Sequence, residues 1–140
     1  MIPTIETERL VLRAPNESDY PVYRDFFSDA DASHFYGGPV SASRAWGVLA
    51  ADIGHWVLRG YGRWSVVVKN SGEMIGCCGL WWPEGTQRSE LTWWIVPRAR
   101  RHGYAFEASQ AAIRFGYRGL GWALVETHMV DEKRSRATAC

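Results

Sequence analysis

The chain lacks the features that mark a secreted, membrane-spanning or strongly charged protein. Its 140 residues include only 3 cysteines, and its formal net charge is +1. So small a charge provides no general attraction for nucleic acid or for an acidic membrane surface. No segment approaches the roughly 20 apolar residues that a membrane-spanning helix needs. The amino terminus, with Glu6 and Glu8, does not resemble a signal peptide. We therefore expect a single cytoplasmic domain, residues 1–140, without nucleic-acid or membrane partners.

The cysteines and histidines indicate neither a disulfide framework nor a metal site. Cys77 and Cys78 are adjacent, and neighbours on a strand point to opposite faces, so they are poorly placed to bond each other. We expect them to be small core residues in a reducing compartment. No histidine pair has the spacing of metal ligands. The histidines are His34, His55, His102 and His128.

Hydrophobic periodicity predicts an α+β (mixed α/β) domain. The expected strands are residues 9–13, 63–69, 74–82, 89–96 and 122–130. The expected helices are residues 16–27, 41–60 and 106–117, with a loop at 28–40. Asn16 and Asp19 resemble a capping box at the start of the first helix, and the second should begin near Ser41 or Ser43 and end at Gly60. The predicted core stripe of the second helix comprises Trp46, Leu49, Ala50, Ile53 and Val57. Because a helix joins the last two strands, we expect a right-handed crossover that makes them parallel.

A basic turn joins the fourth predicted strand to the third helix. The first amides of a helix have no partner within it, and their dipoles favour an anion. Gly103 would let the backbone approach a ligand, and Arg100 and Arg101 would add positive charge. Physical chemistry thus predicts a phosphate-bearing ligand at residues 100–105. The alternative is a solvated basic turn with no ligand.

The turn is not a nucleotide-hydrolase loop, and it lacks the spaced glycines of a dinucleotide-binding fingerprint. Residues 100–105, Arg-Arg-His-Gly-Tyr-Ala, fit the pattern Arg/Gln-x-x-Gly-x-Gly/Ala. This resembles the pyrophosphate-binding turn of the GNAT superfamily of N-acetyltransferases. Residues 6–13, 76–80 and 90–94 resemble strands of its RimJ/RimL-like branch. The similarity covers about residues 6–130.

The resemblance implies a central, mostly antiparallel sheet with helices on both faces. Its fourth and fifth strands would form a parallel pair, splayed by a bulge to admit acetyl-CoA as cosubstrate. The pyrophosphate would lie on the amides of residues 101–105, and the pantetheine arm on freed amides of the fourth strand. The implied cofactor-binding residues are Trp94, Ile95, Val96, Arg100, Arg101, His102, Gly103, Tyr104 and Ala105.

Acetyl transfer to a primary amine, on a protein N-terminus or a small molecule, needs a base. Glu90 is the first candidate, and its alternative role is a solvated strand carboxylate. His128 is the second, although a lone strand histidine is more often structural. Relatives shape the acceptor side with the loop that here contains His34 and Tyr36. Residues 81–82, two tryptophans before a proline, are candidates to line the acceptor pocket.

Beyond residue 130 the sequence departs from the family pattern. Relatives carry Asn-x-x-Ser, a further helix and two closing strands, whereas Glu132 stands where the asparagine would fall. We therefore expect that the closing helix and the last two strands are missing. Either the chain is incomplete or a homodimer partner covers the edge of the 122–130 strand. Because relatives often take the general acid from the closing helix, no general acid is assigned.

Two other functions remain as alternatives. The missing elements would suit a non-catalytic acyl-CoA-binding or dimerisation module. The arginine cluster and the 8 tryptophans invite a nucleic-acid-binding interpretation. The near-neutral charge argues against the latter, because phosphate contacts dominate such affinity.

Overall fold

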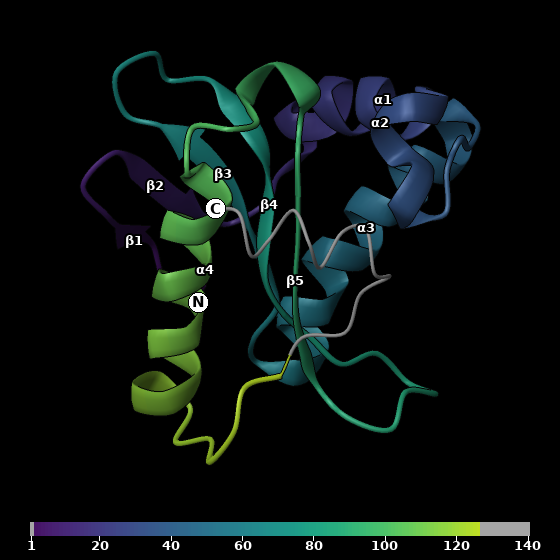
Figure 1. The fold of residues 1–140 in the computed structure, drawn as a ribbon. Coiled ribbons are helices and arrows are strands. Elements are labelled where there is room, and N and C mark those ends of the chain that lie inside the picture. Colours follow the sequence, from purple (N-terminus) through teal and green to yellow (C-terminus); the bar gives the residue numbers. More distant parts are fainter. Residues whose placement is uncertain (1, 127–140) are drawn as a thin grey trace.

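The computed structural model describes residues 2–126 and arranges them in three layers. The strands are β1 (Ile5–Glu6), β2 (Leu10–Arg13), β3 (Arg63–Val68), β4 (Met74–Trp81) and β5 (Glu90–Ile95). The helices are α1 (Tyr20–Ser28), α2 (Ala30–Ser33), α3 (Ala42–Arg59) and α4 (Tyr104–Arg114). Figure 1 shows α4 on one side of the sheet and α1, α2 and α3 on the other. The predicted α+β architecture with helices on both faces is confirmed.

The described sheet is antiparallel throughout, in the order β1-β2-β3-β4-β5. The β4–β5 register runs without a break from the pair Gly76 and Ile95 to the pair Trp81 and Glu90. The predicted bulge at the end of the fourth strand is therefore not seen in this pairing. A register shift lies instead in β3, between Val66 and Val67.

The predicted fifth strand has no counterpart in the described residues. Residues 122–126 contain no strand, and residues 127–130 lie outside the described part, as does the parallel pairing expected of them. The segment nevertheless runs beside β5, because the Leu91 amide donates to the Glu126 carbonyl at 2.6 Å. His128 and Glu132 also lie outside the described residues.

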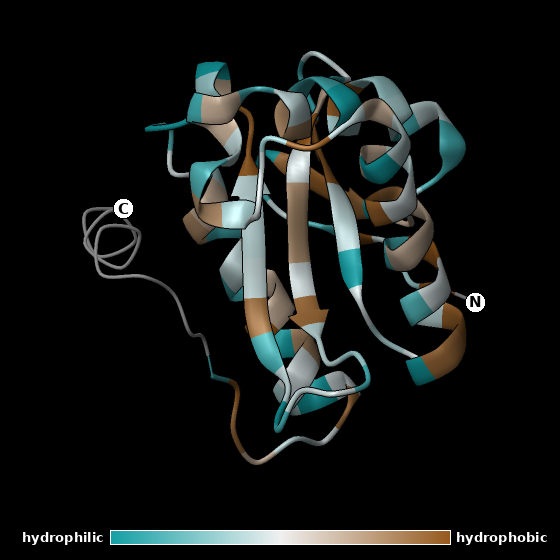
Figure 2. Cartoon of the chain, turned by 90° about the vertical axis from the view of Figure 1, so that its right-hand side faces the viewer, coloured by the Kyte–Doolittle hydropathy of each residue, from teal (hydrophilic) through white to brown (hydrophobic). Residues whose placement is uncertain are grey.

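The sheet face under α4 is apolar. Register places Leu12, Trp64 and Cys78 on this face, and all three are buried. Helix α4 covers them with Ala108 and Ala112, whose small side chains let a helix lie close to a sheet. Figure 2 shows the apolar colouring gathered on the central strands. Close packing of apolar and small side chains is the main contact on this face.

The opposite face, under α1 and α3, buries polar groups. Asp52 and His55 of α3 point inward, whereas Trp46 is 50% exposed and Val57 79% exposed. The predicted apolar stripe of this helix was therefore wrong at both ends, although Leu49 is buried as expected. The stripe failed because the sheet face that α3 covers presents arginine, serine and cysteine side chains.

Several local signals were confirmed. Asn16 forms the predicted capping box with Asp19, Ser41 caps α3, and Gly60 ends α3 in the left-handed conformation. The region predicted as a loop, 28–40, instead contains α2 and a 3₁₀ turn at His34–Tyr36. Its short helix follows the cap made by Asp29, whose side chain accepts from the amides of residues 31 and 32.

The two strand cysteines are buried, unbonded and on opposite faces, as expected. Cys77 lies 2.9 Å from the Tyr23 hydroxyl of α1, and Cys78 lies 3.8 Å from the Ser109 hydroxyl of α4. Within residues 2–126, no helix combines the length and apolar character that crossing a membrane requires.

Candidate functional site

The turn between β5 and α4 presents backbone amides to the outside. A 3₁₀ turn at Pro97–Ala99 is followed by Arg101 and Gly103, both in the left-handed conformation at φ 66° and 78°. Gly103 is the N-cap of α4, and no side chain caps the helix. None of the amides of residues 101–106 donates to another described group. Unpaired amides at a helix start form an anion site.

The arginines of this turn have different roles. Arg98 pairs with Glu73 at 3.1 Å. Arg100 was expected to add charge for a phosphate, but its guanidinium donates to the carbonyls of Ile95 (3.0 Å) and Ala32 (3.1 Å). It is half-buried and ties the turn to β5 and α2 because those carbonyls need donors. Arg101, by contrast, is exposed at the surface of the turn.

Two residues far away in sequence brace the turn from the β2 side. Arg9 donates to the His102 carbonyl at 2.8 Å and to Glu107 at 2.7 Å, and its guanidinium lies over the Tyr104 ring. Glu107 also accepts from the Thr7 hydroxyl at 2.5 Å. Desolvation acts to raise the pKa of Glu107, but the hydrogen bonds from Thr7 and Arg9 outweigh it and lower that pKa below 4.5. The carboxylate therefore stays charged and holds the first turn of α4.

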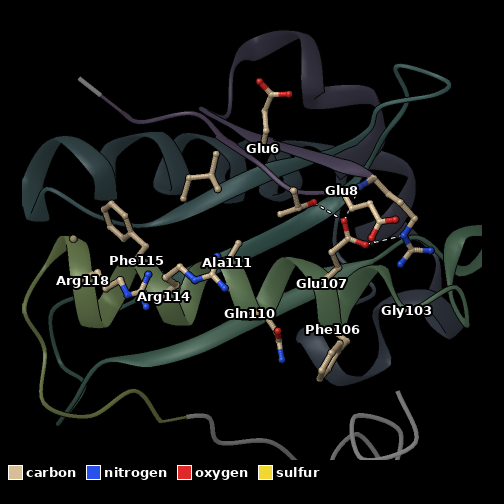
Figure 3. Close-up of a pocket in the computed structure, with 14 residues that line it drawn as sticks. Glu6, Glu8, Gly103, Phe106, Glu107, Gln110, Ala111, Arg114, Phe115 and Arg118 are labelled. Carbon is tan, nitrogen blue, oxygen red and sulfur yellow. Dashed lines mark hydrogen bonds and ion pairs between the residues drawn. The ribbon is translucent and has the colours of Figure 1, made fainter.

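A groove of about 780 Å³ runs between the segment of residues 5–9 and α4 (Figure 3). Glu8 and Glu107 lie towards one end, and Arg114 and Arg118 towards the other. Among the predicted site residues, Gly103 lines the groove, whereas Glu90 and the β5 residues do not. This groove is thus separate from the predicted reaction centre.

The pleat of β5 decides which of its amides face outward. The Val96 amide donates to the Ile75 carbonyl of the β4 side at 2.8 Å, whereas the Leu91 amide donates outward to Glu126. Because backbone groups alternate along an antiparallel strand, Ile95 shares the outward side with Leu91, and Trp94 faces β4 with Val96. Of the three amides predicted to bind pantetheine, only that of Ile95 therefore faces the outer edge, and the Val96 amide is engaged by the sheet.

Glu90 lies half-buried at the start of β5, directly across from Trp81 of β4. It shares a sheet face with Thr92 and Trp94, on the α1 side. The Trp81 ring contacts the Arg63 guanidinium at 3.8 Å. No ion pair joins Glu90 to another residue of the described part.

The other residues predicted for the acceptor side lie at or near the surface. His34 is exposed, and Tyr36 packs its ring against Phe26 at 5.5 Å. Trp82 is at the surface, where its indole donates to the Thr86 carbonyl. The structure therefore brings Trp81 next to Glu90 but leaves His34 at the surface.

These elements match a known family. Residues 9–139 fit the acetyltransferase (GNAT) domain. The chain belongs to the GNAT family of acetyltransferases. Members of this family use acetyl-CoA as the acetyl donor.

Relatives and solved structures agree with this assignment. YoaA of Bacillus subtilis, an uncharacterized N-acetyltransferase, is 26% identical over 124 residues, which cover 86% of this chain and 70% of YoaA. The crystal structure of an acetyltransferase from Agrobacterium tumefaciens has a TM-score of 0.90 and 31% identity, covering 99% of this chain and 80% of that one. RimL, a ribosomal α-N-protein acetyltransferase, has a TM-score of 0.70 at 19% identity, covering 99% and 78%, which shows a shared fold.

His55 of this GNAT domain is fully engaged and is no free base. Its Nε2 accepts from the Trp82 amide at 2.9 Å, so Nδ1 carries the proton and donates to the Tyr61 carbonyl at 2.7 Å. Its ring also stacks on Trp81 at 4.4 Å. Desolvation lowers the pKa of His55 below 6.5, although the backbone hydrogen bonds act in the opposite direction. The residue fixes the start of the β4–β5 connection.

A charged network that sequence reasoning missed lies under α1 and α3. Asp52 accepts from the Tyr23 hydroxyl at 2.6 Å and from two nitrogens of Arg63, at 2.9 and 2.5 Å. Desolvation raises the pKa of Tyr23 well above 10.0, and that of Cys77 well above 9.0, with the charge of Asp52 adding to both. Cys77 is therefore a protonated core thiol and not a nucleophile. The sequence signal that could have revealed this network is the position of Asp52, one helical turn from both Leu49 and Trp56, which are buried.

A second network on the same face joins β2, α1 and β3. Asp19 pairs with Arg13 at 2.7 Å and accepts from the Ser65 hydroxyl at 2.7 Å. Desolvation would raise the pKa of Asp19, but the hydrogen bonds from Arg13, Ser65 and the Asn16 amide outweigh it and lower that pKa below 3.8. The start of α1 is thereby fixed against the sheet of the GNAT domain.

Proposed function

We propose that this GNAT domain transfers the acetyl group of acetyl-CoA to a primary amine, either a protein N-terminus or a small molecule. The observation that carries the proposal is the unpaired run of amides at residues 101–106, beside the outer edge of β5. Strand, left-handed turn and uncapped helix together suit a diphosphate next to an extended chain that pairs with a strand edge.

The donor fits the residues that are present. The amides of residues 101–106 would hold the diphosphate, with the exposed Arg101 guanidinium adding charge. The outward backbone of Ile95 would pair with the pantetheine arm. Its carbonyl is bonded to Arg100, so this side chain would share or release that acceptor when the arm binds. When bound, acetyl-CoA supplies an activated thioester.

Glu90 is the proposed general base. An amine is protonated at neutral pH and must lose a proton before it can attack a carbonyl. Glu90 is half-buried, carries no ion pair within the described residues, and points to the α1 side of the strand that would hold the donor. Its carboxylate would take the proton from the amine directly or through water. The amine nitrogen then bonds to the acetyl carbon, the C–S bond of the thioester breaks, and CoA leaves as a thiolate that takes up a proton to give the free thiol. His128, the second candidate, lies outside the described residues.

A thiol-release assay with a panel of amines tests the reaction. We expect turnover with wild type and a fall of about 10²–10⁴-fold in kcat for Glu90→Gln, the range typical of a lost general base. Glu84→Gln is the matched control, because Glu84 is 100% exposed in the connection that precedes β5. Unchanged kcat in Glu90→Gln would remove Glu90 from the mechanism. Tight CoA binding without turnover on any amine would instead support a non-catalytic acyl-CoA-binding module.

Calorimetry with CoA and with pantetheine measures how much the diphosphate and nucleotide add to donor binding. CoA and pantetheine differ by the nucleotide and its diphosphate, so the amide cradle predicts much tighter binding of CoA. Equal affinity for the two would contradict the assignment of the turn.

A further inference from the structure

Two polar side-chain atoms of β5 are buried without a hydrogen-bond partner in the described structure. They are the Thr92 hydroxyl oxygen and the Trp94 indole nitrogen. The two residues are adjacent positions on one face of the strand, the face that also carries Glu90. Each buried polar atom of this kind calls for an explanation, because leaving it unpaired destabilises the fold.

The surroundings of Trp94 are aromatic. The indole is 1% exposed, stacks on Phe26 at a centroid distance of 4.3 Å, and meets Phe27 and Tyr23 edge-on at 5.4 and 5.1 Å. The Tyr23 hydroxyl is already bonded to Asp52. A phenylalanine could make these ring contacts without burying an unpaired N–H.

The contrast with the rest of this sheet face is informative. The buried polar side chains there are all hydrogen-bonded, and they comprise Asp19, Asp52, His55 and Ser65. The exceptions are confined to the strand that carries the proposed base. Local rules that fail at one place in an otherwise satisfied structure point to function.

We infer that Thr92 and Trp94 bind the acceptor and select its class. The inference rests on the proposed function. An indole N–H only donates, so its ligand partner must be an acceptor. The reacting amine does not serve, because it is either protonated or uses its lone pair in the attack, so the partner is an oxygen. The Thr92 hydroxyl can donate or accept beside it. An amine with a carbonyl close by, as in the N-terminus of a peptide, satisfies this requirement, whereas a simple alkylamine does not.

Because Trp94 is covered by α1, an entering oxygen reaches it when part of the α1–α2 cover shifts. Ala32 of α2 is held towards β5 through Arg100, the same side chain that occupies the Ile95 carbonyl. Donor binding along the β5 edge and acceptor entry under α2 therefore involve the same group, the Arg100 guanidinium.

Trp94→Phe and Thr92→Val test the inference through two quantities that should change in opposite directions, the melting temperature and kcat/KM for a peptide acceptor. We expect each variant to raise the melting temperature of the free protein, since an unpaired buried group is removed. Each should also lower kcat/KM for a peptide acceptor by about 10-fold, the effect of one lost hydrogen bond, while kcat/KM for an alkylamine changes little. Trp64→Phe is the matched control. That indole is buried on the opposite face and donates to the Pro3 carbonyl at 2.9 Å, so its loss should lower the melting temperature without changing acceptor preference.

The indole signal of Trp94 gives a readout independent of turnover. Its ¹H–¹⁵N resonance, assigned by its loss in Trp94→Phe, should shift when CoA and the peptide are both added, but not with CoA and the alkylamine. A resonance that does not move with the peptide, as an internal water partner would produce, overturns the inference. The inference is also overturned if both variants turn over and keep the wild-type ratio of kcat/KM for the peptide to kcat/KM for the alkylamine. If wild type acetylates no amine at all, the proposed function falls, and this inference with it.

Discussion

The two faces of the sheet are stabilised in different ways. Under α4 the contacts are between apolar and small residues such as Leu12, Trp64 and Ala112, all buried. Under α1 and α3 the sheet presents Arg63 and Arg13, and the carboxylates that neutralise them come from the helices. An apolar interface is non-directional and tolerates substitutions that keep volume. A buried ion network depends on every member, because the loss of one partner leaves the other buried charge unpaired.

The same comparison bears on function. The face under α1 and α3 carries Glu90, and its networks tie α1 and α3 to β2 and β3 of the same sheet. The four substitutions or conditions below test this comparison, from the largest expected effect to the smallest.

Asp52→Ala should be the most damaging change. It would leave the Arg63 guanidinium, whose side chain is only 15% exposed, and the buried Tyr23 hydroxyl without their shared acceptor. We expect the free energy of unfolding to fall by about 3–5 kcal/mol, measured by denaturant titration. Asp25→Ala is the control, since the Arg24–Asp25 pair is exposed and should change stability by less than about 0.5 kcal/mol. A loss in Asp52→Ala as small as in the control would mean that the network contributes no stability.

Ala112→Leu tests the apolar face. The added side chain has no space between α4 and the sheet, so we expect a loss of about 1–3 kcal/mol from overpacking. Ala51→Leu adds the same volume on the exposed side of α3 and should be nearly neutral. Equal stability of the two variants would show that α4 does not pack closely.

Gly103→Ala tests the cradle. Gly103 has φ 78°, and a side chain there costs about 1–2 kcal/mol of stability. Gly85→Ala is matched, because Gly85 has φ 94° with open space around it, and it should lose similar stability. Calorimetry should show weaker CoA binding for Gly103→Ala alone. Parallel losses of CoA affinity in both variants would point to general strain instead of a specific cradle.

Lowering the pH should weaken the anchor made by His55. The pKa of His55 is depressed in the folded protein, so between that value and 6.5 the unfolded chain binds a proton that the native chain does not. Stability is therefore fully present above about pH 6.5 and falls as the pH drops below it. Urea unfolding at pH 7.5 and 5.5 measures this loss, and His55→Gln should reduce it. An identical pH slope in the variant would assign the loss to other groups.

The sequence by itself determined the features that depend on neighbouring residues. The capping box at Asn16, the end of α3 at Gly60 and the glycine turn before α4 were all predicted, because each is a local interaction of a few residues. Local chemistry also placed Cys77 and Cys78 on opposite faces.

Tertiary structure decided the rest. Arg9 and Glu107 meet across 98 positions of sequence, and no spacing rule relates them. Arg100 was predicted to add charge for a phosphate, whereas in the structure its side chain donates to backbone carbonyls of β5 and α2. Asp52 broke the apolar stripe of α3 because its partner Arg63 lies on the strand beneath it. A buried polar residue is stable only opposite a partner, and the partner is set by which elements the fold brings together.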